Sequence, residues 1–138
     1  MTTHIRSFQT DDLSEAREYI ANIFQPHFLR AQTVGGHGTL FRVEHASYAA
    51  EIQVARYSYG VPVDNDVGRP EKFYALTVTL AGSASFNHPD GSLLISPGKA
   101  AFAAPSAYQR SLSDEHHRKL VVRIDRMALE KVLGWDEH

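Results

Sequence analysis

FYALTVTLAGSASFNHPDGSLLISPG, which is residues 73–98, is the stretch that decides the fold class. It contains three short runs rich in β-forming residues, separated by Ala81-Gly82 and by Pro89-Asp90-Gly91. Turn residues between runs of this length are typical of antiparallel strands joined by hairpins. In the first run apolar residues alternate with threonines, so we expect one buried face, which consists of Tyr74, Leu76, Val78 and Leu80.

The same pattern extends on both sides of this stretch. We predict eight strands, over residues 39–46, 50–59, 73–80, 83–88, 92–96, 99–103, 108–112 and 119–124. Short strands at regular spacing are typical of an antiparallel barrel or sandwich. The polar segment 64–71 is predicted to be a mobile loop. Pro89-Asp90-Gly91 is predicted to be a tight hairpin turn, because glycine there can take a positive φ.

Two helices flank the β region. Between Thr10 and Phe24 apolar residues recur at helical spacing, which predicts an amphipathic helix. Thr10 or Asp11 can cap this helix, and Pro26 stops it. A second, short helix is predicted after Asp125, with Gly134 at its end. The predicted order is therefore helix, all-β body, helix.

Composition sets limits on the function. The 138 residues are enough for one hydrophobic core, so we treat residues 1–138 as a single domain. The formal net charge of -2 lacks the positive excess that holds a phosphate backbone, so we do not expect this chain to bind DNA. The sequence shows no cysteine, no signal peptide and no apolar run long enough to span a bilayer, which favours a cytoplasmic protein without disulfides.

Motifs for catalysis and metal binding are not found in the sequence. The eight histidines show no His-x-His or HExxH spacing, so we predict no metal site and place the histidines on the surface or in loops. There is no Gly-x-Ser-x-Gly elbow, and the Gly36-x-Gly38 pair precedes a strand, where it cannot act as a phosphate cradle. The charged cluster 114–118 is predicted to be a solvated turn. We therefore predict no catalytic residue and no cofactor.

A first resemblance comes from the spacing of turn residues. Gly91, Pro97-Gly98 and Pro105 together resemble the second motif of cupin barrels. Metal-binding cupins have a histidine shortly after the second glycine, whereas residues 99–104 hold none, and the first cupin motif has no match. The chain thus resembles a cupin barrel without its metal.

A second resemblance covers nearly the whole chain, which strongly resembles the N-terminal sensor domain of AraC/XylS-type transcription regulators. The motifs that carry it are Phe8-x-Thr10-Asp11, Phe24-Gln-Pro26-His27, Arg56-Tyr-x-Tyr59-Gly60, Tyr74 to Gly82, Pro97-Gly98, Pro105, and Leu120 to Asp125 followed by Leu129 and Leu133. The resemblance implies a mainly β, antiparallel cupin-like (double-stranded β-helix) barrel that binds a small-molecule effector and takes part in homodimerisation. It also implies that DNA is contacted only through a helix-turn-helix module absent from this chain.

Candidate ligand contacts are aromatic or guanidinium groups within otherwise apolar strands. They are Phe41, Arg56, Tyr74, Tyr108 and Arg110. Arginine can pair with a carboxylate and rings can stack on an aromatic ligand, so an anionic or aromatic compound is expected. The alternative is that the rings pack in the core and the arginines lie on the surface.

Two other functions stay open. One is a small cupin-type enzyme, an isomerase or a dioxygenase. The other is a ligand-free dimerisation module that uses Leu129, Val132, Leu133 and Trp135.

Overall fold

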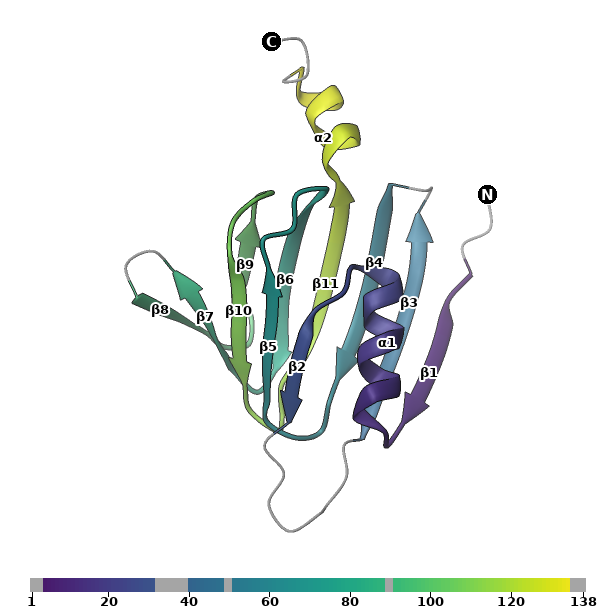
Figure 1. Ribbon diagram of the computed structural model, residues 1–138, viewed down its shortest axis with the longest axis vertical. Coiled ribbons are helices and arrows are strands. Elements are labelled where there is room, and N and C mark those ends of the chain that lie inside the picture. The colour runs from purple at the N-terminus through teal and green to yellow at the C-terminus, as the bar shows by residue number, and fades with distance from the viewer. Residues whose placement is uncertain (1–3, 32–39, 49–50, 89–90, 135–138) are drawn as a thin grey trace.

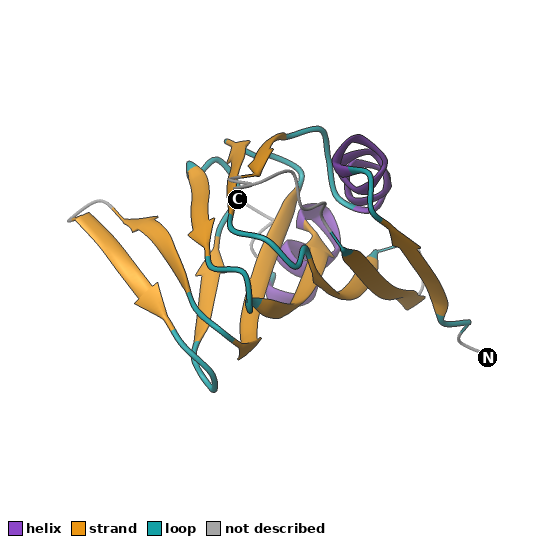
Figure 2. Cartoon of the chain, turned by 90° about the horizontal axis from the view of Figure 1, so that it is seen from below, coloured by secondary structure: helices purple, strands orange, loops and turns teal. Residues whose placement is uncertain are grey.

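The computed structural model describes residues 4–31, 40–48, 51–88 and 91–134, most of which are in strands (Figures 1 and 2). In chain order the elements are β1 (Arg6–Thr10), α1 (Leu13–Ile23), β2 (Phe28–Ala31), β3 (Phe41–Tyr48), β4 (Ile52–Ser58), β5 (Val63–Gly68), β6 (Phe73–Ala81), β7 (Ala84–His88), β8 (Gly91–Ile95), β9 (Ala100–Ala103), β10 (Gln109–Ser113), β11 (Arg118–Asp125) and α2 (Arg126–Leu133). Both predicted helices and a strand at each of the eight predicted places are confirmed.

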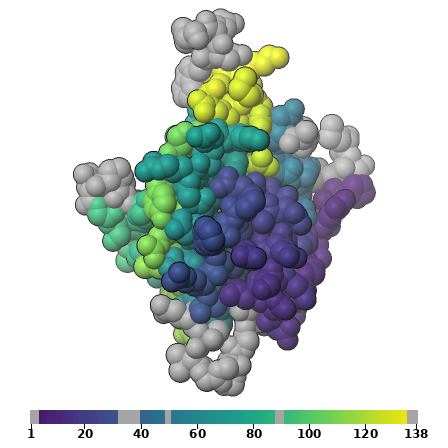
Figure 3. All heavy atoms as spheres, viewed as in Figure 1, coloured from purple at the N-terminus to yellow at the C-terminus, as the bar shows by residue number. Residues whose placement is uncertain are grey.

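The described strands form two antiparallel sheets. One has six strands in the order β1-β3-β4-β11-β6-β9, and the other has five in the order β2-β5-β10-β7-β8. Many neighbours are far apart in the chain, so the chain crosses repeatedly between the two sheets. Helix α1 lies beside β2, and α2 projects from one end of the body (Figures 1 and 3).

Helix α1 begins later than the sequence predicts. Asp12 is its cap, because the Asp12 carboxylate accepts hydrogen bonds from the backbone N–H groups of Ser14 and Glu15, at 2.8 and 3.2 Å. Thr10, one of the predicted caps, instead ends β1. The buried face of α1 consists of Ala16, Ile20 and Ile23.

The hydrophobic core occupies one side of the space between the sheets. The buried face of α1 packs there against the inner residues of β3 and β4. Phe41 is fully buried, and its ring centroid lies 6.1 Å from that of Tyr57 and 5.3 Å from that of Tyr59. This aromatic cluster anchors α1 to the six-stranded sheet.

The predicted loop at 64–71 is wrong in its first half, which belongs to strand β5. Val63 and Asn65 are buried, whereas the alternating residues Asp64 and Asp66 are partly exposed. The strand pairs with both β2 and β10. Its acidic residues lie on the outer face, where Asp64 pairs with Arg110 and Asp66 accepts a hydrogen bond from Tyr108, so they do not prevent strand formation.

The predicted buried face of the first central strand is correct only at Tyr74, which is 7% exposed. In β6 the inward side chains are those of Phe73, Ala75, Thr77 and Thr79, and Thr79 is only 1% exposed. Leu80, on the predicted buried face, is 37% exposed. The apolar outer side of β6 is partly covered by α2 and by Phe102, whose ring stacks on Tyr74 at 5.8 Å. The inner side has small and polar residues because it borders a cavity and a buried histidine.

That histidine is His117, which the sequence wrongly places in a solvated turn. It is 6% exposed, and its Nε2 lies 3.1 Å from the Thr79 hydroxyl. The turn before β11 packs closely on Gly82, where an added Cβ would lie 2.5 Å from backbone atoms of His116 and His117. Burial lowers the pKa of His117 to about 4, so its imidazole is neutral at physiological pH.

Some sequence predictions concern residues outside the described ranges, namely Gly36, Gly38, Trp135 and the turn residues Pro89 and Asp90. Strands β7 and β8 on either side of that turn pair antiparallel. At the other predicted helix, Asp125 caps α2 by accepting from the Ala128 N–H, and Gly134 ends it with φ +74°. In the described ranges no helix is long and apolar enough to cross a membrane, and no three His, Asp or Glu side chains are grouped so as to hold a metal ion.

Candidate functional site

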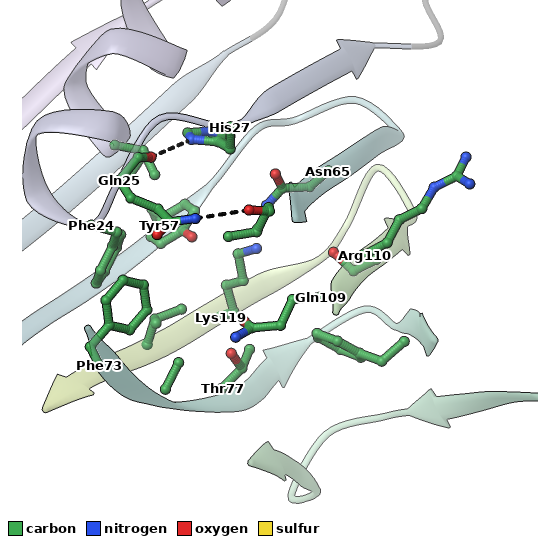
Figure 4. Close-up of a pocket in the computed structure, with 16 residues that line it drawn as sticks. Phe24, Gln25, His27, Tyr57, Asn65, Phe73, Thr77, Gln109, Arg110 and Lys119 are labelled. Atoms are coloured by element: carbon green, nitrogen blue, oxygen red, sulfur yellow. Dashed lines mark hydrogen bonds between the residues drawn. The ribbon is translucent and has the colours of Figure 1, made fainter. Parts of the chain in front are cut away.

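A cavity of about 70 Å³ lies between the two sheets, beside the aromatic core. Its walls come from the end of α1, the segment that follows α1, and strands of both sheets. Much of the lining is apolar, with Phe73 and Val121 as examples. Figure 4 shows that polar side chains also border this space, among them His27, Asn65, Gln109 and Lys119. Apolar walls with a few placed polar groups are typical of small-molecule sites.

Lys119 brings a buried charge to this cavity. It lies on the inner face of β11 together with Val121, and its side chain is only 5% exposed. Its ammonium group is 4.8 Å from the centroid of the Tyr57 ring, and none of the ion pairs of the described residues includes it. Burial lowers the pKa of Lys119 to about 8, because an ammonium group removed from water loses hydration.

His27 reaches the cavity from the segment between α1 and β2. Its Nδ1 lies 3.0 Å from the Gln25 carbonyl oxygen, and its buried Nε2 has no hydrogen-bond partner in the described chain. A carbonyl oxygen can only accept, so Nδ1 carries the proton and Nε2 presents a lone pair. Burial lowers the pKa of His27, which keeps the ring neutral.

Two amide side chains complete the polar lining. Asn65 on β5 is 6% exposed, and its Oδ1 has no partner within the described residues; the same holds for Nε2 of Gln109 on β10. A buried polar atom without a hydrogen bond costs about 1–3 kcal/mol. The cavity therefore gathers several unsatisfied polar atoms, and a bound molecule with matching groups would satisfy them.

The segment before β2 closes one side of the cavity. The Gln25 side chain donates a hydrogen bond from Nε2 to the Val67 carbonyl oxygen, at 2.8 Å, and so ties this segment to β5. Phe24 and His27 from the same segment line the cavity. Arg123 of β11 donates to the Ile23 carbonyl oxygen at 3.2 Å, which joins the end of α1 to the strand that carries Lys119.

Three of the five predicted ligand contacts lie away from this cavity. Phe41 is in the aromatic core. Arg56 is exposed on the outer face of the six-stranded sheet, where it pairs with Glu44 at 2.9 Å. Tyr74 lies on the outer side of β6 and donates its hydroxyl proton to Glu130 of α2 at 3.3 Å.

The other two predicted contacts are brought together on the outer face of the five-stranded sheet. Tyr108 donates its hydroxyl proton to Asp66 at 2.8 Å, and Arg110 pairs with Asp64 through two bonds, of 3.0 and 2.7 Å. Arg110 also borders the cavity, but Figure 4 shows its guanidinium group pointing away from it. Contact of any of the five residues with a ligand stays a prediction.

The cavity residues themselves were missed by the sequence analysis. Lys119 had a usable signal, because a lysine in phase with Val121 on a strand must face the same side. Asn65 stands in the segment predicted as a loop, His27 follows the predicted helix outside any predicted strand, and Gln109 stands in the predicted strand 108–112 without a pattern that marked its side as the buried one.

Comparison with known proteins assigns the family. A model of the AraC-binding-like domain matches residues 16–137. The chain belongs to this family. The predicted resemblance to AraC-type sensor domains and the mainly antiparallel, cupin-like fold are thereby confirmed. No curated protein matches the chain in sequence.

Solved structures support the fold of this AraC-binding-like domain. The AraC-like transcriptional activator CuxR is similar with a TM-score of 0.74 and 10% identity, over 95% of this chain and 51% of the CuxR chain. The chain thus spans about half the length of CuxR. KdgF from Halomonas sp. is similar with a TM-score of 0.51 and 13% identity, over 70% of this chain and 88% of KdgF.

Proposed function

We propose that this domain senses a small molecule for an AraC-type transcription regulator and that the molecule binds in the cavity between the sheets. The observation that carries the proposal is the set of buried, unpartnered polar atoms on the cavity wall. Such atoms destabilise the fold when they are left without partners, so a protein that keeps them together gains stability when a ligand binds. The family assignment supports the same function.

Strand β11 gives the cavity a direct connection to α2. Lys119 stands near the start of β11, and the strand passes at Asp125 into the helix. Helix α2 is held to β6 by the Tyr74–Glu130 hydrogen bond, and Arg126 pairs with Glu130 at 2.9 Å. A ligand that shifts β11 would therefore move the base of α2.

Helix α2 also supports a role in dimerisation. None of its residues is buried, and Met127, Val132 and Leu133 are 64%, 83% and 47% exposed. Exposed apolar side chains on one short helix are typical of a surface that packs against a partner. We propose a second copy of the chain as this partner, with binding of the effector altering how the two helices meet.

Contact with DNA is assigned in this proposal to a separate module. The net charge of -2 disfavours phosphate binding by this chain, and the chain spans about half of the CuxR length. A sensor of this kind acts in the cytoplasm, where the DNA is. We propose no enzymatic activity, and expect a bound ligand to be recovered chemically unchanged after prolonged incubation with the protein.

A thermal-shift screen of carboxylates, phenols and sugars tests the proposal. A ligand at about 100 times its Kd stabilises the folded state by about 2.7 kcal/mol, which raises the Tm by several degrees. Ala75→Leu places extra volume in the cavity and should abolish the shift. Ala100→Leu is the matched control, because Ala100 is exposed on β9. A broad screen without any hit, or a hit that Ala75→Leu leaves unchanged, would overturn the assignment of the cavity.

A further inference from the structure

The polar atoms of the cavity are of two kinds. Lys119 Nζ and Gln109 Nε2 are donors, and the lysine also brings a positive charge. His27 Nε2 and Asn65 Oδ1 are acceptors. In Figure 4 Lys119 and Gln109 enter the cavity from strands of opposite sheets, and the Lys119 side chain extends toward the side on which His27 and Asn65 lie. A ligand that satisfies both kinds of atom needs an acceptor group as well as a donor group.

The charge of Lys119 determines which kind of acceptor group the ligand should carry. None of the ion pairs of the described residues includes Lys119, and its nearest charge-stabilising contact is the face of the Tyr57 ring. A buried ammonium group without a counter-ion is costly, and an anion that enters the cavity would offset this cost. Neutral acceptors such as a ketone or an amide would leave the charge uncompensated.

The lone pair of His27 determines which kind of donor group the ligand should carry. Because Nδ1 is occupied by the Gln25 carbonyl oxygen, Nε2 can only accept. Asn65 Oδ1 is also an acceptor without a partner in the described chain. A hydroxyl group can donate to one of these two atoms, whereas a second carboxylate would be repelled by both lone pairs.

We propose that the ligand is a small hydroxycarboxylate, with its carboxylate accepting hydrogen bonds from Lys119 and Gln109 and its hydroxyl donating to His27 or Asn65. This inference rests on the proposed function, because it names the ligand of the same cavity. Pockets for drug-sized ligands have volumes of about 300–1,000 Å³. The cavity of about 70 Å³ therefore suits a molecule of a few heavy atoms.

Such a ligand would bind in a pH-dependent manner. The ionisable groups that face Lys119 from the neighbouring elements are His27, Tyr57 and His117. Burial holds both histidines neutral at physiological pH and raises the pKa of Tyr57 far above it, so Lys119 alone titrates near pH 8. Above that pH the lysine loses its charge, and affinity for an anion should fall about tenfold per pH unit, because one proton is taken up with the anion.

Three probes of nearly equal size separate the contributions of charge and hydroxyl. Lactate has both groups, propionate lacks the hydroxyl, and lactamide lacks the charge. In isothermal titration with the full chain at pH 7, we expect lactate to bind at least tenfold more tightly than either of the other two. Raising the pH from 8 to 9 should weaken lactate binding about fivefold, because the pKa of Lys119 is about 8, and leave lactamide binding unchanged.

Variants assign each contribution to its residue. Lys119→Met should remove the preference for lactate over lactamide, and replacing both acceptors, by His27→Phe with Asn65→Leu, should remove the preference for lactate over propionate. His27→Gln with Asn65→Leu keeps an acceptor and should restore part of the second preference. Lys99→Met is the matched control, because Lys99 is exposed, and both preferences should survive it.

The outcomes separate this inference from the proposed function. If all three probes bind equally or not at all, while a phenol or sugar gives a shift that Ala75→Leu abolishes, the hydroxycarboxylate is wrong and the sensor function stands. If Lys119→Met leaves the preference for lactate over lactamide intact, Lys119 is not the counter-ion. If no compound of the wider screen binds, both proposals fail.

Discussion

Replacing Lys119 by methionine should make the protein more stable at neutral pH. Methionine keeps the unbranched shape and removes the buried charge. Burial lowers the pKa of Lys119 from 10.5 to about 8, and each tenfold change in an acid constant is worth about 1.4 kcal/mol, so burying the charged form costs roughly 3 kcal/mol. The contact of the ammonium group with the Tyr57 ring offsets up to about 2 kcal/mol of this cost. We therefore expect Lys119→Met to raise the free energy of unfolding by about 1–3 kcal/mol at pH 7.

The stability advantage of Lys119→Met should decrease with pH in a defined way. Between pH 8 and 10.5 the unfolded chain keeps a proton on Lys119 that the folded protein has released. The free energy of unfolding of the wild type should therefore rise with pH across this window, and the advantage of the variant should shrink. Urea unfolding of wild type, Lys119→Met and the exposed control Lys99→Met, from pH 6.5 to 10.5, measures this. A difference between wild type and Lys119→Met that is constant over the whole range would refute the assignment of a buried, charged lysine.

Three further predictions concern other parts of the fold. Gly82→Ala should lower the free energy of unfolding by at least about 2 kcal/mol, because φ is +67° and the new Cβ would meet backbone atoms. Gly98→Ala, at φ +85° in open space, should lower it by about 1 kcal/mol. Chemical denaturation compares the two variants, and equal losses would contradict the role of the close contact. Asp12→Ala removes the cap of α1 and should lower the free energy of unfolding by about 1 kcal/mol, with no change expected if the helix is fixed by its packing alone. Tyr74→Phe loses the hydrogen bond to Glu130 and should speed amide exchange in α2 while leaving the Tm almost unchanged; unaltered exchange would show that the bond does not hold the helix.

Periodicity predicted most of the fold because most elements bury one face. Both predicted helices and the eight predicted strands were found at their expected places, whereas the short strands β1 and β2 beside α1 were not predicted. Strand β5 was missed because its outward residues Asp64 and Asp66 are typical of a loop when the partner arginine on β10 is not known. Whether a polar residue is solvated or paired across strands depends on the tertiary structure.

The inward face of β6 was predicted wrongly for a related reason. Sequence patterns assume that the more apolar face of a strand is the buried one. In this protein the interior next to β6 contains a cavity and the imidazole of His117, so Thr77 and Thr79 point inward and the leucines and valines point outward. A strand that lines a binding site is where this assumption is least reliable.

The polar residues whose side chains lie inside the cavity were not among the predicted ligand contacts. An anionic or aromatic ligand was expected from two arginines and three aromatic rings, but the structure places both arginines on outer faces with carboxylate partners. The cation inside the cavity is Lys119. An arginine paired with an aspartate and a lysine without a counter-ion are indistinguishable in sequence, because the partner comes from a distant strand.

The continuous run from β11 into α2 makes the domain a suitable starting point for an engineered biosensor. About 20 Å of β-strand separates Lys119 from Asp125, and no flexible linker interrupts it before the helix starts. A fluorescent reporter fused after α2 would be connected to the ligand pocket by a rigid strand and helix. Substitutions around Lys119 would then change which small molecule is detected, while β11, α2 and the reporter stay the same.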